Sequence, residues 1–503
     1  MHSEIQKIAV QKRPPELRFE GRVLFLVDDA ELIRRQLNGE DLELTPDLRA
    51  KLRDQISTDE ITPAYICYYF DETLGEFPYL GLRAGGEAPI TRGSVKKGGF
   101  VCSVAGKRRG KGSSREQSPY AEMMAGIRVV IAENIERIYN ENCQNLGILT
   151  STDFSLIERI RAGEDIPITA FTEGVDPITR EIIEYGGLFE FNVARLQGRV
   201  DIPAVESQDL APDTGLDTHD PQEVRRARGA SEHRAGHEAW SPAEAAEETT
   251  TTSRPNNAPA AAPEGTGTRR SRTGSRPMTV AEKIFARSWV VDAAAGEYGV
   301  PWVKPGDSGF VRTDWRFSHE YVTPMAAIFF EEKLGPDAKV NDASTILMFR
   351  DHLTYLHQVM PQERVQLGLL DVATQLKVKQ QEFAEKQGIR LYGERLGARI
   401  GSEAICHSKM LEEYALPGDV IVGTDSHTPH SGAIGCIAFG VGTTAIFNSW
   451  ITKDVRVSVP PSFKVVIRGR KPDHVTAKDF MLEILRHPYI RDGHAIGQII
   501  EYA

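Results

Sequence analysis

Three short stretches of this 503-residue chain carry side chains that could act together on one small anionic molecule. The first is a glycine-flanked loop at 110–116, with the sequence GKGSSRE, which runs into a segment with a helical pattern. Backbone N–H groups at a helix start, the hydroxyls of Ser113 and Ser114, and the guanidinium of Arg115 would together bind a carboxylate or phosphate. Ser113 and Glu116 also have the spacing of a capping box, so an ordinary helix start with solvated basic residues is the alternative.

The other two stretches follow apolar runs and place a carboxylate beside an imidazole. TDSHTP at 424–429 follows the run VIVG, and Asp351–His352 follows the run STILMF. In open α/β sheets ligands bind at the carboxyl ends of the strands, so Asp425, Ser426 and His427 could reach one reacting molecule. A surface turn capped by Asp and Ser, or a histidine with only a structural role, is the alternative for each stretch.

Histidines are concentrated in the second half of the chain. Residues 3–218 contain none, whereas residues 278–503 contain nine of the thirteen. Imidazole is the side chain that exchanges protons near neutral pH, so we expect the proton-transfer groups there.

These side chains must be positioned by sheets covered with helices. Before residue 206, the sequence predicts strands at 65–70, 99–105 and 128–132, and helices at 119–124 and 134–146. After residue 277, the apolar runs at 344–349, 418–423 and 463–469 alternate with long amphipathic segments such as 369–387. This alternation predicts an α/β fold on both sides.

Between these two parts, residues 206–277 are poor in aliphatic side chains and rich in Pro, Ser, Thr, Gly and charge. Such a segment cannot offset its ordering entropy by burial, so we expect a disordered linker. Directly after it, Thr279 and Glu282 have capping-box spacing ahead of a helical pattern. We therefore expect domains at 1–205 and 278–503.

The overall composition excludes several classes of protein. A formal net charge of −11 opposes binding to nucleic acid, and no apolar run is long enough to span a membrane. The first residues resemble neither a secretory signal nor an import helix, so we expect a cytoplasmic protein. The five cysteines are scattered and form no C-x-x-C pair, which predicts reduced structural thiols and no metal site in this chain.

Together the motifs resemble the aconitase superfamily, the iron–sulfur hydro-lyases that include aconitase, homoaconitase and isopropylmalate isomerase. The stretch that begins GSSREQSPYAEMMAG is similar to the family's swivel domain, which is the small subunit of isopropylmalate isomerase. The stretches DHLTYLHQ, ICHSKMLEEYALPGDVIVGTDSHTP and IGQIIEY are similar to the amino-terminal half of the large subunit. The resemblance implies a swivel-type α/β domain followed by an incomplete three-layer α/β domain.

The resemblance also implies roles for residues that match the family's motifs. Ser113 matches the serine that removes the proton next to a carboxylate, while Ser114 and Arg115 match groups that bind the substrate carboxylate. Ser426 matches a residue that contacts substrate. The remaining residues implied in catalysis form three carboxylate–imidazole pairs, which are Asp351 with His352, His407 with Asp425, and His427 with Glu501.

Three departures from the family pattern affect these expectations. Gln117 stands where the family commonly has His, and the swivel-like part comes first rather than last. The family's large subunit also continues into domains with three cysteines that hold a [4Fe-4S] cluster, and this chain lacks them. We therefore expect a subunit of a hydro-lyase acting on a small hydroxy di- or tricarboxylic acid, with the cluster supplied by a second polypeptide. The alternative is a non-catalytic, truncated relative that binds a carboxylate or a partner protein.

Overall fold

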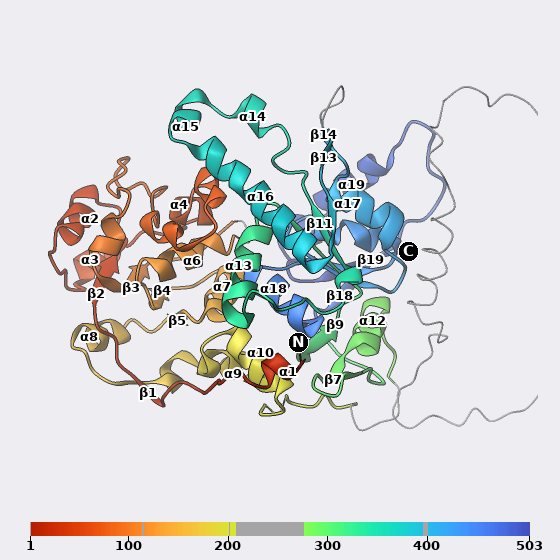
Figure 1. Ribbon diagram of the computed structural model, residues 1–503, viewed down its shortest axis with the longest axis horizontal. Coiled ribbons are helices and arrows are strands. Elements are labelled where there is room, and N and C mark those ends of the chain that lie inside the picture. The colour runs from red at the N-terminus through yellow and green to blue at the C-terminus, as the bar shows by residue number, and fades with distance from the viewer. Residues whose placement is uncertain (1, 113–114, 201, 208–275, 396–400) are drawn as a thin grey trace, which may run out of the picture.

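The computed structural model describes residues 2–112, 115–200, 202–207, 276–395 and 401–503 (Figure 1). The first part contains a parallel sheet in the order β2-β3-β4-β5. Its strands are β2 (Arg22–Phe25), β3 (Phe100–Ala105), β4 (Val129–Ala132) and β5 (Leu149–Ser151). The helices of this part include α2 (Ala30–Leu37), α6 (Gln117–Met124), α7 (Arg137–Leu146), α8 (Leu156–Arg161), α9 (Pro177–Tyr185) and α10 (Leu188–Leu196). All six residues of β3 are buried, as expected for a parallel strand covered on both faces.

The second part is built on a five-stranded parallel sheet in the order β12-β11-β10-β15-β16. The strands are β10 (Trp315–His319), β11 (Ile346–Phe349), β12 (Arg390–Tyr392), β15 (Val420–Gly423) and β16 (Ile437–Gly440). Further elements are α12 (Val280–Ser288), α13 (Thr323–Leu334), α16 (Leu369–Gln387), α17 (Cys406–Lys409), α18 (Thr443–Thr452), and the antiparallel pair β9 (Ser308–Arg312) and β17 (Asp454–Ser458).

Alternating side chains of β11 show that this sheet is the middle of three layers. Ile346 and Met348 belong to the hydrophobic cluster that contains α13, α16 and α18 side chains. Leu347 and Phe349 belong to a separate cluster on the other face, with residues of α17 and of the turn that follows it. The α/β class and its parallel sheets are therefore confirmed.

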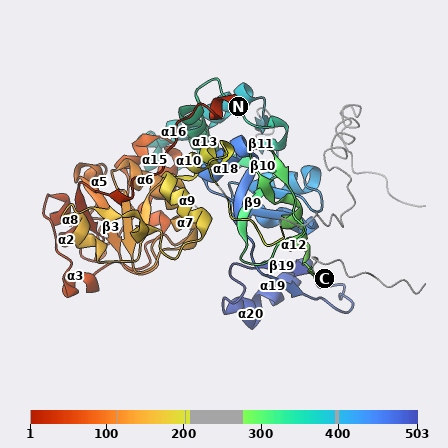
Figure 2. The same ribbon diagram turned by 90° about the horizontal axis from the view of Figure 1, so that it is seen from below.

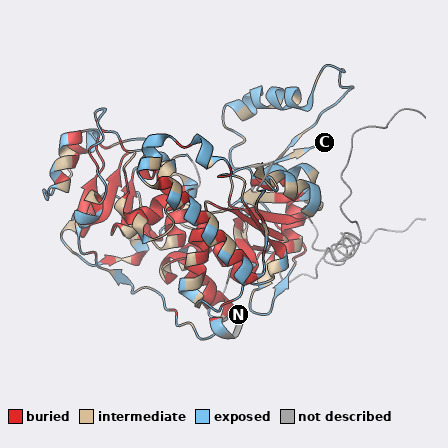
Figure 3. Cartoon of the chain, turned by 45° about the horizontal axis from the view of Figure 1, so that its top comes forward, coloured by how far each residue is buried: buried red, intermediate tan, exposed pale blue. Residues whose placement is uncertain are grey.

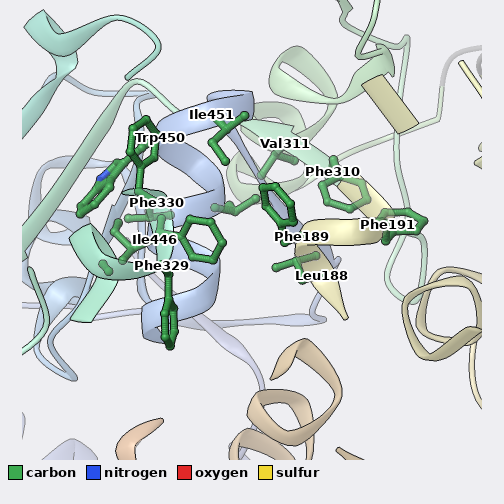
Figure 4. Packing of buried hydrophobic residues seen from close by; sticks show 14 of the residues in the cluster. Leu188, Phe189, Phe191, Phe310, Val311, Phe329, Phe330, Ile446, Trp450 and Ile451 are labelled. Carbon is green, nitrogen blue, oxygen red and sulfur yellow. The ribbon is translucent and has the colours of Figure 1, made fainter. Parts of the chain in front are cut away.

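The two parts share one hydrophobic core (Figure 4). Helix α10 packs on α18, and the ring of Phe189 stacks on Phe447 with centroids 5.8 Å apart. Within the same contact, Arg195 and Asp454 form a buried ion pair at 2.6 Å. The expected linker, 206–277, lies almost wholly outside the described residues, and at its near end Ser207 is buried and donates a hydrogen bond to the carbonyl of Trp302.

One predicted element is wrong. The run at 65–70 was expected to be a strand, but residues Ala64–Tyr68 form a 3-10 helix. Its aromatic side chains pack between the two parts of the molecule, where the ring of Tyr68 stacks on Tyr321 at 5.8 Å. High β-propensity reflects packing on a pleated surface, and here a helical turn provides the packing instead.

The last residues form a separate unit of a different character. Strands β18 (Ser462–Val465) and β19 (Ile499–Tyr502) pair in parallel, and α19 (Ala477–Arg486) and α20 (Pro488–Arg491) lie between them in sequence. Figure 2 shows α19 and α20 at the lower edge of the molecule, away from the helices that cover the five-stranded sheet. A membrane-crossing helix would need a longer apolar stretch than any helix among the described residues provides.

Candidate active site

Three neighbouring strands of the five-stranded sheet end in polar side chains. Strand β10 lies between β11 and β15, and all three run parallel, so their carboxyl ends meet at one edge of the sheet. We name the side chains at this edge the strand-end cluster; its members are His319, Glu320, Asp351, His352, His407, Asp425 and His427.

Asp425 is the centre of the strand-end cluster. Its Oδ1 lies 2.8 Å from Nε2 of His407 and 3.0 Å from Nδ1 of His427, and it accepts a hydrogen bond from the His427 N–H at 2.7 Å. Its Oδ2 lies 3.4 Å from Nε2 of His352. Although burial opposes it, these contacts hold the pKa of Asp425 well below its usual range. One carboxylate therefore contacts three imidazoles.

Asp351 and His352 form the expected pair, with Oδ1 of the carboxylate 2.7 Å from Nδ1 of the ring. The other oxygen of Asp351 accepts the N–H of Cys406 at 2.7 Å, which places α17 and hence His407 beside the cluster. Burial favours the neutral imidazole, but the hydrogen bond and charge of Asp351 outweigh it and raise the pKa of His352 to about 9. His352 is therefore a cation at neutral pH, and its Nε2–H points toward Asp425.

The structure adds His319 and Glu320, which the sequence reasoning missed. The ring of His319 stacks on that of His352 with centroids 4.1 Å apart, and burial lowers its pKa to about 3, so it stays neutral. Oε1 of the buried Glu320 accepts the N–H groups of His352 and Leu353 at 2.8 and 2.6 Å. In the sequence this His-Glu pair follows WRFS, which alternates apolar and polar residues, so the signal is weaker than the continuous apolar runs before the other polar pairs.

His407 and His427 differ in their surroundings. Burial lowers the pKa of His407, which is mostly enclosed, so it too is neutral at pH 7. The side chain of His427 is 80% exposed, and the hydroxyl of the exposed Ser426 lies 3.4 Å from its Nδ1. The open side of the cluster is therefore at His427 and Ser426.

The expected pairing of His427 with Glu501 is not found. Glu501 lies on β19, where its carboxylate accepts the N–H of Ala281 at the start of α12 at 3.0 Å. The partner of His427 is Asp425, two residues before it, because the turn after β15 folds the carboxylate back onto the following N–H and ring. Glu501 caps a helix and lies outside the contacts that the strand-end cluster makes.

The glycine-flanked loop of the first part is only partly described. Ser113 and Ser114 lie outside the described residues, so their expected roles stay predictions. The guanidinium of Arg115 forms an ion pair with Asp59. Gln117 reaches the second part, where its Nε2 donates to the carbonyl of Tyr321 at 3.4 Å, directly after Glu320. The start of α6, directly after the loop, thus contacts the residue that follows Glu320 of the strand-end cluster.

Glu116 does not serve the role that its spacing suggested. A capping box would turn its carboxylate back to the residue three positions earlier, at the start of its own helix. Instead, the carboxylate accepts hydrogen bonds from the N–H and the hydroxyl of Thr444, in the other part of the molecule. The tertiary contact replaces the local one because the side chain is buried against α18.

The cysteines of this chain do not fit an iron–sulfur cluster. All five are buried and free. Burial raises the pKa of the Cys67 thiol to about 12 and also raises those of Cys102, Cys143 and Cys406, whereas cluster ligands are thiolates. In the described parts of the chain, the groups of side chains close enough to share a metal ion contain only His, Asp and Glu.

Two family models match separate parts of the chain. The model of the aconitase family (aconitate hydratase) matches residues 292–503, and the model of the aconitase C-terminal domain matches residues 93–152. The strand-end cluster lies within the first match and the glycine-flanked loop within the second. The domain that is C-terminal in the family model therefore comes first in this chain.

Curated relatives agree with these matches. The large subunit of 3-isopropylmalate dehydratase from Sulfurihydrogenibium is 32% identical over 41% of this chain and 42% of the relative. That of Pyrococcus furiosus (large subunit 1) is 34% identical, again over 41% and 42%, and the chloroplastic one of Arabidopsis thaliana is 29% identical over 41% and 38%. This chain thus spans about two-fifths of the length of these relatives. Their names do not favour the alternative of a non-catalytic relative.

Among solved structures, 3-isopropylmalate dehydratase (leuD) from Methanocaldococcus jannaschii matches 28% of this chain and 89% of its own, with 23% identity and a TM-score of 0.21. The likeness to known families comes instead from the two model matches, the curated relatives, and the polar strand ends within the matched region. On these grounds, both parts of the chain are similar to proteins of the aconitase/isopropylmalate isomerase superfamily.

Proposed function

We propose that this chain is part of a hydro-lyase that dehydrates and rehydrates a small hydroxy di- or tricarboxylic acid. The observation that supports it best is the strand-end cluster, in which Asp425 contacts three imidazoles and one of them, His352, is cationic at neutral pH. A cationic imidazole can protonate a leaving hydroxyl, and neutral neighbours can accept a proton. Dehydration needs a group that donates a proton and a group that accepts one, and hydration needs the same two kinds of group.

In the dehydration direction, the alkoxide of Ser113 is proposed to take the proton from the carbon next to a substrate carboxylate, which makes the side chain a neutral hydroxyl. The electrons of that carbon–hydrogen bond form the double bond, the carbon–oxygen bond of the hydroxyl breaks, and His352 supplies the proton with which water leaves. Ser114, Arg115 and Ser426 are proposed to bind substrate oxygens. Arg115 would exchange Asp59 for the substrate, since a guanidinium can bind a substrate carboxylate in place of that of Asp59.

Enzymes of this family generally use a [4Fe-4S] cluster, which when bound would supply Lewis-acid chemistry to the substrate. The buried cysteines of this chain do not fit such a cluster. We therefore propose a second polypeptide that supplies the ligands. Action in the cytoplasm, without nucleic acid or membrane as partners, stays a prediction from the sequence.

The terminal segment, residues 460–503, supports a protein partner. None of its residues is buried, and Figure 3 colours the region near the C-terminal end mostly as exposed. Purely parallel sheets normally have both faces covered, yet β18 and β19 pair in parallel with apolar side chains in solvent. The exposed apolar side chains of this segment include those of Met481, Leu482, Leu485, Tyr489, Ile496, Ile500 and Tyr502.

The test is reconstitution. Purified alone, the chain should be colourless, should hold no stoichiometric iron or sulfide after anaerobic reconstitution, and should not turn over citrate, isocitrate, homocitrate or isopropylmalate. Adding a polypeptide with the family's cysteine-bearing domains should give both cluster and turnover, and Ser113→Ala should then lower kcat by about two to four orders of magnitude. Equal turnover of Ser113→Ala and wild type would reject the proposed role of Ser113 in proton removal. A cluster assembled by this chain alone would reject the proposal that a second polypeptide supplies the cluster ligands.

A further inference from the structure

The carboxylate of Glu116 is enclosed at the contact between the two parts of the molecule. The residue is 1% exposed, and Oε2 accepts the backbone N–H of Thr444 at 2.8 Å while Oε1 accepts the Thr444 hydroxyl. Thr444 is in the first turn of α18, where unpaired N–H groups and the helix dipole favour a negative charge. Glu116 thus occupies a site on the other part of the chain, 328 residues away in sequence.

Gly442, the residue before α18, leaves the space for this carboxylate. Its φ of −73° is one that any residue adopts, so glycine is not needed there for backbone reasons. A Cβ at this position would overlap with the Glu116 carboxylate and lie 2.6 Å from Oδ1 of Asn142. The missing side chain therefore serves the contact with the first part.

The residues on both sides of this contact are close to the candidate active site in the chain or in space. Glu116 directly follows Arg115 and the two serines of the glycine-flanked loop. Gly442 follows β16, whose last residue, Gly440, is so close to the backbone of Asp425 that an added Cβ would lie 2.8 Å from the Asp425 carbonyl oxygen. The hydrogen bond of Gln117 to the Tyr321 carbonyl adds a second connection to the same edge of the sheet.

We propose that Glu116 is a positioning residue, whose carboxylate, held between Gly442 and Thr444, fixes Arg115 and the start of α6 at one place relative to the strand-end cluster. The importance of that placement for turnover rests on the proposed function, but the placement itself does not. A loop tied at its last residue to the second part has fewer positions available than one that ends in solvent.

The charge of Glu116 gives the contact a pH dependence. Burial raises its pKa to about 7, although the Thr444 N–H and hydroxyl favour the ionised form. The charge of Glu141, on α7, also opposes ionisation, whereas Asn142 on α7 and Thr443 on α18 are neutral. Because the buried carboxyl binds its proton more tightly than a solvated one, the contact should weaken as pH rises toward about 7 and stay level above it.

The test measures where the loop lies, without substrate or turnover. Spin labels at Lys111→Cys, in the loop, and Glu412→Cys, in the second part, report the distance distribution in the full chain at about pH 6 and about pH 8, on either side of the pKa. We expect one narrow distribution at the lower pH and one about twofold wider at the higher pH. Glu116→Gln, whose amide oxygen still accepts the Thr444 N–H, should give the narrow distribution at both pH values.

Gly442→Ala should give the wide distribution at both pH values, because the added methyl displaces the carboxylate. Gly432→Ala is the matched control, since an added Cβ there meets nothing within 4 Å. Circular dichroism confirms that each variant is folded. Glu116→Ala, which removes the carboxylate without filling its space, is the second variant and should also give the wide distribution at both pH values. Narrow distributions in Glu116→Ala and in a folded Gly442→Ala would overturn the proposal, whereas equal distributions of wild type and Glu116→Gln at both pH values would overturn its pH dependence. If the distance distributions are as expected but the assembled enzyme is inactive, the proposed function is rejected and the positioning role of Glu116 is not.

Discussion

The second part of the chain contains the same dipeptide in two different surroundings. In the body, residues 278–459, Asp351 is 5% exposed and contacts the His352 ring at 2.7 Å. In the terminal segment, Asp473 and His474 are both exposed. The parallel strands follow the same division, since β10, β11 and β15 are covered on both faces whereas no residue of β18 or β19 is buried. Residue types supply the capacity for chemistry, and the fold decides which other side chains each of them contacts.

The largest effect should come from the core of the body. Phe447 is 2% exposed, and its ring packs on Phe189 of the first part and Phe329 of the second. Phe447→Ala should lower the free energy of unfolding by about 3–5 kcal/mol, measured by urea denaturation, because it leaves a cavity shared by both parts. A loss below about 1 kcal/mol would mean that the shared core does not hold the two parts together.

The next effect separates the two Asp-His pairs. Asp351→Asn removes the charge and the hydrogen bond that raise the pKa of His352, so that pKa should fall by about one to three units. NMR titration of the His352 ring measures it. The matched control is Asp473→Asn, which removes the exposed carboxylate and should leave the His352 titration at its wild-type position. An unchanged His352 pKa in Asp351→Asn would contradict the assigned pair.

A smaller effect concerns the pH dependence of stability. The pKa of Glu116 is raised from 4.5 to about 7 in the folded chain, so between these values the folded state holds a proton that the unfolded state has lost. Stability should therefore fall as pH rises from about 4.5 to about 7 and become level above it, by about 1–3 kcal/mol in total from this group. Urea denaturation of wild type and Glu116→Gln at several pH values measures how the free energy of unfolding changes with pH. The part of that change that comes from Glu116 should be missing in the glutamine variant.

The smallest effect should come from the terminal segment. Leu482, on α19, is 54% exposed, and Leu482→Ala should change the free energy of unfolding of the isolated chain by no more than about 0.5 kcal/mol. The same variant should weaken binding of a cysteine-bearing partner if that partner covers α19, measured by calorimetry against wild type. A stability loss as large as that of Phe447→Ala would show that α19 is buried in solution and that the two regions do not differ.

Most of the secondary structure and part of the site could be predicted from the sequence. The runs that became β3, β4, β11 and β15 were predicted because a buried parallel strand needs a continuous apolar stretch, which is a local property. The capping box of Thr279 and Glu282 was equally local and is present. His319 and Glu320 were missed because the stretch before them, WRFS, alternates apolar and polar residues and is not a continuous apolar run.

The sequence itself thus determined which reactive groups lie at the ends of the strands. A strand that is followed by Asp-His or Asp-Ser-His carries those groups at its carboxyl end in whatever order the strands are arranged. Only the tertiary structure decided which groups meet. It gave Asp425 rather than Glu501 to His427, and it took the Glu116 carboxylate from its own helix to α18. Such contacts join residues far apart in the chain, and their partners depend on how two sheets and their helices pack, which no local pattern encodes.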